Sequence, residues 1–182
     1  MDKEITFECR ELTKENLTAD LLKNFDRFQV TTKAWYKVQD MHIINDISFT
    51  DNWDNKKKAS IVRDLKKCIA NGGFVVGAYS KNKLVGFAAV EGMFFGSNNQ
   101  YLELSYLHTT KNLRGLGIGS ELFNLCCVKA KINGASKLYI GAHPSVKTQK
   151  FYKRYGCVYA TEINKKILKR EPLDIQLEKL LQ

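Results

Sequence analysis

The pattern of apolar and polar positions predicts strands and helices along most of the chain. Residues 74–80 and 84–92 are apolar runs joined by a short polar turn, which is typical of an antiparallel hairpin. In 101–109, apolar residues alternate with polar ones, which predicts another strand. A broad apolar helix over 118–132 and a short strand over 137–142 follow. This strand, helix, strand order predicts that the last two strands are parallel.

The N-terminal part of the chain carries a weaker pattern. Residues 5–10 alternate and predict a strand, and 18–28 place apolar residues at helical spacing and predict a helix. Residues 29–47 have no helical period, which predicts an irregular segment or a hairpin. A second helix is expected over 56–70, with Asp54 as its N-cap.

The C-terminal part is expected to add a helix and one or two strands. His143-Pro144-Ser145 opens a helix that Gly156 ends, and 157–163 is typical of a returning strand. Residues 174–181 predict an edge strand or a short helix. An exposed edge strand there would offer a surface for pairing with a second copy, so a homodimer stays an alternative. Together these elements predict one mixed α/β domain over 1–182, without a linker.

Composition supports a folded protein and excludes several classes. The hydrophobic content of 44% suits a globular chain of 182 residues, and no run approaches the ~18 apolar residues of a membrane span, so we expect no membrane partner. The five cysteines show no CxxC spacing, which favours free thiols in a reducing cytoplasm. With only three histidines and no ligand spacing, no metal site is expected.

The net charge of +10 has three competing explanations. Basic patches bind nucleic acid, and positive charge also attracts an anionic cofactor or substrate. The third explanation is a solvated, lysine-rich surface. The charge is spread along the chain, with only short clusters at 56–58 and 165–166. This distribution disfavours a nucleic-acid partner, but charge alone does not decide.

A glycine-rich loop follows the strand over 101–109. Gly115, Gly117 and Gly119 alternate with other residues just before the helix over 118–132. The first amides of a helix have no partners within it, and glycine lets an anion approach them closely. Arg114 stands at the entrance with a planar set of donors. The sequence therefore predicts a site for a phosphate or pyrophosphate.

Two common nucleotide motifs do not match this loop. A dinucleotide fingerprint requires a third glycine at position 120, where this chain has Ser120, and an acidic residue after the next strand, which ends in Gly141-Ala142-His143. No G-x-x-x-x-G-K-[ST] run is present for a P-loop.

The loop matches R-x-x-G-x-G at Arg114, Gly117 and Gly119, and it is followed by F-Y-x-x-x-G over 151–156. In this order and spacing the chain resembles the GNAT superfamily of acetyl-CoA-dependent N-acetyltransferases, from about 5 to 163. The resemblance implies a mixed, mostly antiparallel central sheet flanked by helices, with a parallel strand pair at the acetyl-CoA site. It also implies acetyl-CoA as the acyl donor.

The resemblance implies which residues bind acetyl-CoA. They lie at the end of the strand, in the glycine loop and at the start of the tyrosine's helix: Leu107, His108, Thr109, Arg114, Gly115, Leu116, Gly117, Ile118, Gly119, Ser120, Ser145 and Tyr152. The loop would hold the pyrophosphate, and the strand end would offer backbone groups to the pantetheine. Where the family often has Asn and Ala, this chain has Ser145 and Thr148.

The resemblance also implies two catalytic residues, each with a structural alternative. Tyr152 corresponds to the general acid that protonates the leaving thiolate, although it could equally be a core tyrosine. Glu103 lies where some members carry the general base, although an exposed carboxylate paired with a lysine is the simpler interpretation. His108 is another candidate base by its pKa, but alternation predicts that it faces away from Glu103. Water is a further candidate.

The resemblance therefore implies an N-acetyltransferase that moves an acetyl group directly to a primary amine, and we favour a small-molecule acceptor. The acceptor is expected to bind 21–53, and Asp46, Asp51, Asp54 and Glu91 are candidates for an acidic patch. A non-catalytic acyl-CoA sensor or scaffold, and an acetyltransferase for protein or RNA, stay open.

Overall fold

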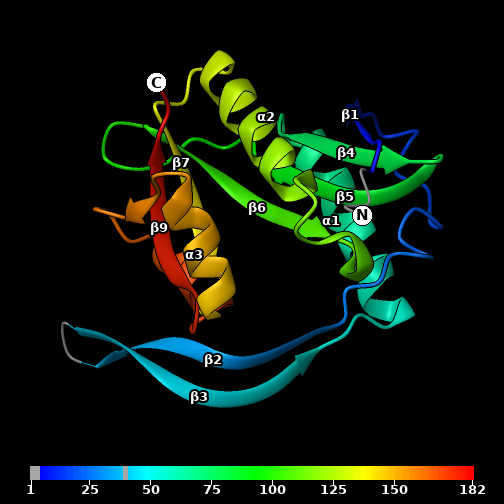
Figure 1. Cartoon of the computed structure of the whole chain (residues 1–182). Helices are drawn as coiled ribbons and strands as arrows, with labels where there is room; N and C mark the ends of the chain where they lie inside the picture. The colour runs from blue at the N-terminus through cyan, green and yellow to red at the C-terminus, as the bar shows by residue number, and fades with distance from the viewer. Residues whose placement is uncertain (1–4, 39–40) are drawn as a thin grey trace.

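The computed structural model describes residues 5–38 and 41–182. In this part of the chain, seven strands form one sheet in the order β1-β4-β5-β6-β7-β9-β8 (Figure 1). They are β1 (Glu8–Leu12), β4 (Phe74–Ser80), β5 (Lys83–Val90), β6 (Tyr101–Thr109), β7 (Lys137–Ala142), β8 (Val158–Tyr159) and β9 (Ile175–Leu180). Every neighbouring pair is antiparallel except β6 and β7, which are parallel. The predicted mixed sheet with one parallel pair is confirmed.

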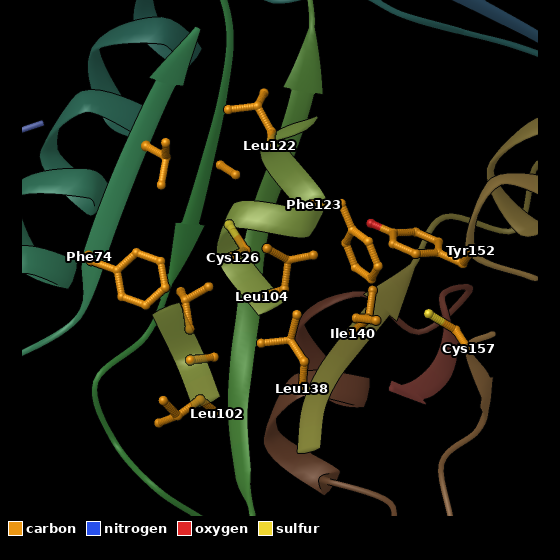
Figure 2. Close-up of a cluster of buried hydrophobic side chains, with 14 of the residues drawn as sticks. Phe74, Leu102, Leu104, Leu122, Phe123, Cys126, Leu138, Ile140, Tyr152 and Cys157 are labelled. Carbon is orange, nitrogen blue, oxygen red and sulfur yellow. The ribbon is translucent and has the colours of Figure 1, made fainter. Parts of the chain in front are cut away.

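Helices cover both faces of this sheet. They are α1 (Asn55–Ala70), α2 (Ile118–Ile132), α3 (Val146–Arg154) and α4 (Lys165–Arg170), with a short 3₁₀ turn, η1 (Lys111–Leu113). Val76 and Ala88 pack on the α2 side, whereas their strand neighbours Val75 and Ala89 pack on the α1 side. The core on the α2 side also includes the facing residues of α3 (Figure 2). No helix within the described ranges is long and apolar enough to cross a membrane.

A separate hairpin, β2 (Gln29–Val38) and β3 (Met41–Asp51), lies across one end of the sheet (Figure 1). It confirms the hairpin expected over 29–47. The helix that follows is also confirmed, and the Asp54 carboxylate accepts a hydrogen bond from the Lys57 amide at 2.7 Å. An N-cap of this kind satisfies one of the free amides of the first turn.

The helix expected over 18–28 is wrong, because this segment forms successive turns. Backbone hydrogen bonds join Leu21 to Thr18 and Phe25 to Leu22, each spanning three residues, and no helix is formed. Leu17, Leu22 and Phe25 are nevertheless buried against α1. Consecutive turns can bury residues at this spacing as well as a helix can. The first strand also starts later than expected, at Glu8.

The C-terminal elements differ from the prediction in two ways. The strand expected over 157–163 shrinks to β8, and the chain then forms α4, which the sequence pattern did not predict. The strand expected over 174–181 is formed as β9, but its expected edge position is wrong, because β9 lies between β7 and β8. Its central residues, Gln176, Leu177 and Glu178, are buried. The expected pairing surface is therefore occupied by β8 at Leu177 and Glu178.

The parallel strands β6 and β7 pair over a short distance and then separate. Their register joins Tyr101–Glu103 to Lys137–Tyr139 and goes no further. Beyond Glu103, the side of β6 that faces away from β5 has no strand partner. The pairing of β6 with β5 also shifts here, because Ala89 pairs with Tyr106 and Val90 with Leu104. Ser105 is therefore the extra residue of a β-bulge, a feature that redirects side chains.

Candidate active site

The glycine loop has a backbone that only glycine adopts readily. Gly115 and Gly117 have φ of 84° and 85°, in the left-handed region. Gly117 is the N-cap of α2, and no side chain caps this helix end. A Cβ at either glycine would meet nothing within 4 Å. The amides of Ile118, Gly119 and Ser120, in the first turn of α2, therefore have no capping side chain, as an anion site requires.

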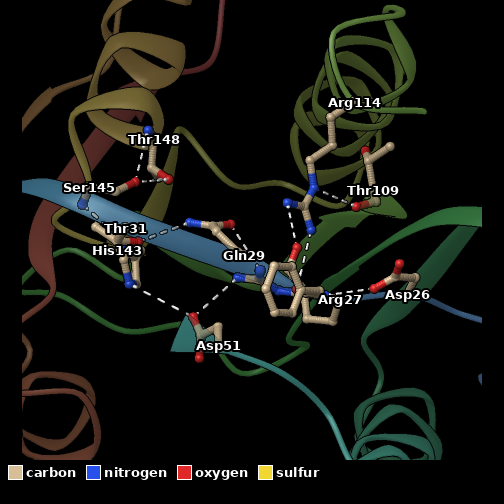
Figure 3. Close-up of polar contacts among 11 residues, drawn as sticks. Asp26, Arg27, Gln29, Thr31, Asp51, Thr109, Arg114, His143, Ser145 and Thr148 are labelled. Carbon is tan, nitrogen blue, oxygen red and sulfur yellow. Dashed lines mark hydrogen bonds and ion pairs between the residues drawn. The ribbon is translucent and has the colours of Figure 1, made fainter. Parts of the chain in front are cut away.

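Arg114 is engaged by the protein itself (Figure 3). Its guanidinium donates to the backbone carbonyls of Thr109 at 3.2 Å, Phe28 at 3.0 Å and Arg27 at 3.3 Å. These bonds join the end of β6 to the segment that enters β2. A guanidinium has five N–H donors, so this role leaves some of them for an anion.

The bulge at Ser105 changes which residues of β6 share a face. Leu102, Leu104 and Leu107 all pack on the α2 side, so the alternation shifts by one residue. Tyr106 and His108 therefore face the α1 side, where both contact Phe87. Glu103 lies on this same side of the sheet, because its strand neighbours Leu102 and Leu104 pack on the α2 side. The expectation that His108 faces away from Glu103 is wrong, because simple alternation does not survive a bulge.

Glu103 lies where β6 and β7 separate. Its side chain is 10% exposed, and one carboxylate oxygen forms an ion pair with the guanidinium of Arg170, the last residue of α4. Burial raises the pKa of Glu103 above its usual value, the Arg170 charge opposes this shift, and Glu91 adds to it. The alternative of a carboxylate exposed and paired with a lysine is wrong, because Glu103 is buried and its partner is an arginine.

Neither histidine of the site is readily protonated. Burial is the main reason that the pKa of His108 falls well below its usual value, and the charges of Arg27 and Arg114 lower it further. Burial also lowers the pKa of His143, although Asp51 opposes this shift. Both imidazoles are therefore neutral at physiological pH.

Tyr152 is packed in the core on the α2 side. The residue is 6% exposed, and its ring lies 5.7 Å from Phe123 and 5.1 Å from Phe151. Figure 2 shows its hydroxyl pointing towards α2. Burial raises the pKa of this phenol far above its usual value, so the hydroxyl keeps its proton. These facts are compatible with a core residue and with a proton donor.

Ser145 caps α3 with its own side chain. The hydroxyl accepts a hydrogen bond from the Thr148 amide at 3.3 Å and lies 2.9 Å from the Thr148 hydroxyl. The Ser145 amide donates to Nδ1 of His143 at 3.1 Å. The serine hydroxyl is thus directed into the helix start, and Thr148 is its partner there.

The hairpin connects the separated ends of β6 and β7. At its start, Arg27 and Phe28 accept the hydrogen bonds of Arg114 from the β6 side. Further along β2, the Trp35 amide donates to the Pro144 carbonyl at 2.9 Å, just after β7. Residues 29–34 therefore bridge the two strand ends (Figure 1).

A polar cluster lies along this bridge (Figure 3). Arg27 is only 9% exposed, and its guanidinium donates to Gln29 at 2.9 Å and lies 3.6 Å from the Asp51 carboxylate. Its Nε has no hydrogen-bond partner among the described residues. Nε2 of His143 lies 4.0 Å from the same carboxylate. This buried cation is one that sequence reasoning missed.

The acidic patch expected from four carboxylates is largely not formed. The Asp54 side chain caps α1, and Asp46 is exposed and lies 4.0 Å from Lys33. Asp51 belongs to the cluster with Arg27. Glu91 accepts a hydrogen bond from Ser105 at 2.6 Å, close to Glu103.

Comparison with known proteins identifies the family. A model of the acetyltransferase (GNAT) family matches residues 38–157, which is more than half of the chain. The chain belongs to the GNAT acetyltransferase family. It is therefore an acetyl-CoA-dependent acetyltransferase. No curated protein matches its sequence.

Solved structures of GNAT acetyltransferases share the fold. A nourseothricin acetyltransferase has 14% identity and a TM-score of 0.68, with 97% of this chain and 99% of that one covered. A Bacillus anthracis structure named for streptothricin acetyltransferase, solved with acetyl coenzyme A, has 16% identity and a TM-score of 0.69, with 99% and 100% covered. An aminoglycoside 6'-acetyltransferase type Ii has 17% identity and a TM-score of 0.63, with 96% and 97% covered.

Sequence reasoning placed the GNAT motif residues but missed their partners. The structure gathers the glycine loop, Thr109 and the Phe151 ring, since a Cβ at Gly119 would lie 3.5 Å from Thr109 and 3.8 Å from Phe151. It adds Arg27 and Arg170, which have no local sequence signal, and it pairs Asp51, expected in an acidic patch, with Arg27. Among the described residues, no group of three His, Cys, Asp or Glu is arranged to hold a metal ion.

Proposed function

We propose that this GNAT acetyltransferase transfers the acetyl group of acetyl-CoA directly to a primary amine of a small molecule. The observation that carries this proposal is the position of Glu103, a buried carboxylate at the point where β6 separates from β7. The relatives named above supply a second support, because their names refer to small-molecule acceptors.

The donor is assigned to the α2 side of the site. The amides at the start of α2, with Arg114 to Ser120, suit the pyrophosphate, because no side chain caps this helix. The strand end from Leu107 to Thr109, His108 included, lies beyond the last β6–β7 pair, so its backbone is free to bind the pantetheine amides. The Ser145 side chain caps α3 and is a weaker candidate for this contact.

The proposed chemistry uses two side chains. Glu103 accepts a proton from the ammonium of the acceptor, and the neutral nitrogen attacks the thioester carbonyl. A backbone amide of β6 stabilises the oxyanion. When the carbon–sulfur bond breaks, Tyr152 donates its proton to the thiolate. The attacking nitrogen loses its second proton, which passes through water to the Tyr152 phenolate, and Glu103 releases the first proton to solvent. The raised pKa of Glu103 lies nearer to neutral pH than that of a free carboxyl, as a general base requires.

A thiol-release screen with acetyl-CoA across amine classes tests this function. We expect steady release with at least one small primary amine. Tight binding of acetyl-CoA without release across the panel would instead indicate a non-catalytic acyl-CoA sensor. Thiol release only with a protein or an RNA would show that the acceptor is a macromolecule of that class. A cytoplasmic location is part of the proposal, and the five unpaired cysteines support it.

A further inference from the structure

The ion pair between Glu103 and Arg170 joins a buried carboxylate to an exposed cation. The Arg170 side chain is 54% exposed, whereas that of Glu103 is 10% exposed. Arg170 is the last residue of α4, and Ile167 anchors this helix among Tyr101 and Tyr139. The helix is therefore fixed while the guanidinium lies at the surface over the carboxylate.

Other groups enclose Glu103 from the remaining elements. Glu91 faces it from the end of β5, Cys68 from α1, and Tyr139 from β7. None of these is a cation. Among the described residues that face Glu103, Arg170 supplies the positive charge, and it lies on the exposed side. An acceptor that reaches Glu103 from solvent must therefore move Arg170 aside.

The displacement is favourable only for a particular class of acceptor. A buried carboxylate that loses its partner is strongly destabilised, unless another cation replaces it. A protonated amine supplies that charge, and it then gives its proton to Glu103. A neutral, weakly basic amine supplies no charge. The displaced guanidinium can interact with other carboxylates, because Asp174 and Glu171 both lie close enough to interact with its charge.

We propose that Arg170 occupies the place of the acceptor's ammonium group, and that the acceptor is a basic alkyl amine that binds as a cation. This proposal rests on the proposed function, because it assumes that the acceptor approaches Glu103. Arg170 is then a positioning residue that sets acceptor specificity. In the free enzyme its positive charge stabilises the Glu103 carboxylate, and it yields only to a competing cation.

The kinetic test compares Arg170→Gln with Lys169→Gln. Lys169 is the exposed neighbour on the same helix, so both variants lose one positive charge. On the high-pH plateau of activity, Arg170→Gln should lower the KM for an alkyl amine roughly tenfold, which corresponds to about 1.4 kcal/mol. The KM for acetyl-CoA should stay unchanged, and Lys169→Gln should resemble the wild type. An unchanged or higher amine KM in Arg170→Gln contradicts the proposal.

Matched acceptors test the class of substrate in the wild type. Benzylamine is cationic at neutral pH, whereas aniline, of similar size, is neutral. We expect thiol release with the alkyl amine and little with the aromatic one. Equal turnover of the two overturns the assignment. Should Arg170→Gln fold poorly, Arg170→Lys keeps the charge and should give a KM nearer to that of the wild type.

A readout without turnover separates this proposal from the proposed function. In protein carrying ¹³C-labelled glutamate carboxyls, Arg170→Gln should raise the pKa of Glu103, whereas Lys169→Gln should not. Benzylammonium added to the wild type should shift the Glu103 carboxyl and Arg170 guanidinium resonances together. These shifts without any thiol release would uphold the ammonium site and overturn the proposed transfer to a small-molecule amine. Absence of both shifts at saturating amine overturns the inference.

Discussion

Replacing Tyr152 with phenylalanine tests whether Tyr152 is a proton donor or only a residue of the core. The ring would keep its contacts with Phe123 and Phe151, at 5.7 and 5.1 Å. The hydroxyl has no hydrogen bond to another described side chain, so its loss leaves no orphaned partner. We therefore expect the free energy of unfolding to change by less than about 1 kcal/mol. The raised pKa keeps the wild-type phenol protonated and able to donate.

The expected effect on turnover is much larger. A general acid contributes about 10²- to 10⁴-fold, and a thiolate is a fair leaving group, so a loss near 10²-fold in kcat is expected. The assay is steady-state thiol release, with acetyl-CoA affinity measured by calorimetry. Tyr155→Phe is the matched control, because Tyr155 follows α3 and packs on the same two rings at 5.3 and 5.0 Å. An unchanged kcat in Tyr152→Phe would leave Tyr152 as a core residue only.

Three further predictions concern the loop, the base and the buried arginine. Gly117→Val should abolish acetyl-CoA binding in calorimetry. Valine rarely adopts a φ of 85°, and its side chain would fill the open space beside the glycine that the proposal assigns to the pyrophosphate. Retained affinity would remove the loop from the donor site. Wild-type activity should fall as pH drops through the raised pKa of Glu103. Glu103→Gln should lose this pH dependence, and its plateau activity should be about 10²-fold lower than that of the wild type. An unaltered pH profile would point to water or to another base. Arg27→Met should raise the pKa of His108, which is measured by its imidazole proton shifts. No change would show that burial and the remaining charges, Arg114 among them, keep this pKa low.

The proposed donor side of the site rests on local sequence signals. The glycines, the start of α2 and the aromatic residues of α3 are each specified within a few residues, and the crossover rule orients the parallel pair. The bulge at Ser105 was not predictable in this way. Leu104 and Tyr106 alternate on either side of it as in a regular strand, so the sequence carries no sign of the extra residue.

The acceptor side could not be predicted because its contacts join distant parts of the chain. Arg170 and Glu103 are 67 residues apart, and α4 is too short for its pattern to stand out. The burial of Arg27 also depends on tertiary packing, since the turns before β2 replace the expected helix. An arginine near an apolar run is normally exposed, so nothing in the local sequence marks this one as buried.

The two halves of the site therefore differ in how they can change. The glycine loop and β6 are constrained by backbone geometry, which a substitution at Gly117 would disturb directly. The proposed acceptor side consists of side chains from the segment before the hairpin, the hairpin and α4, and these elements reach the site through a few contacts, such as the bond from Trp35 to Pro144. Residues on β2 that bridge the strand ends can vary without altering the donor loop. Acceptor specificity should therefore change through Arg27, Asp51 and Arg170, while the affinity for acetyl-CoA stays constant.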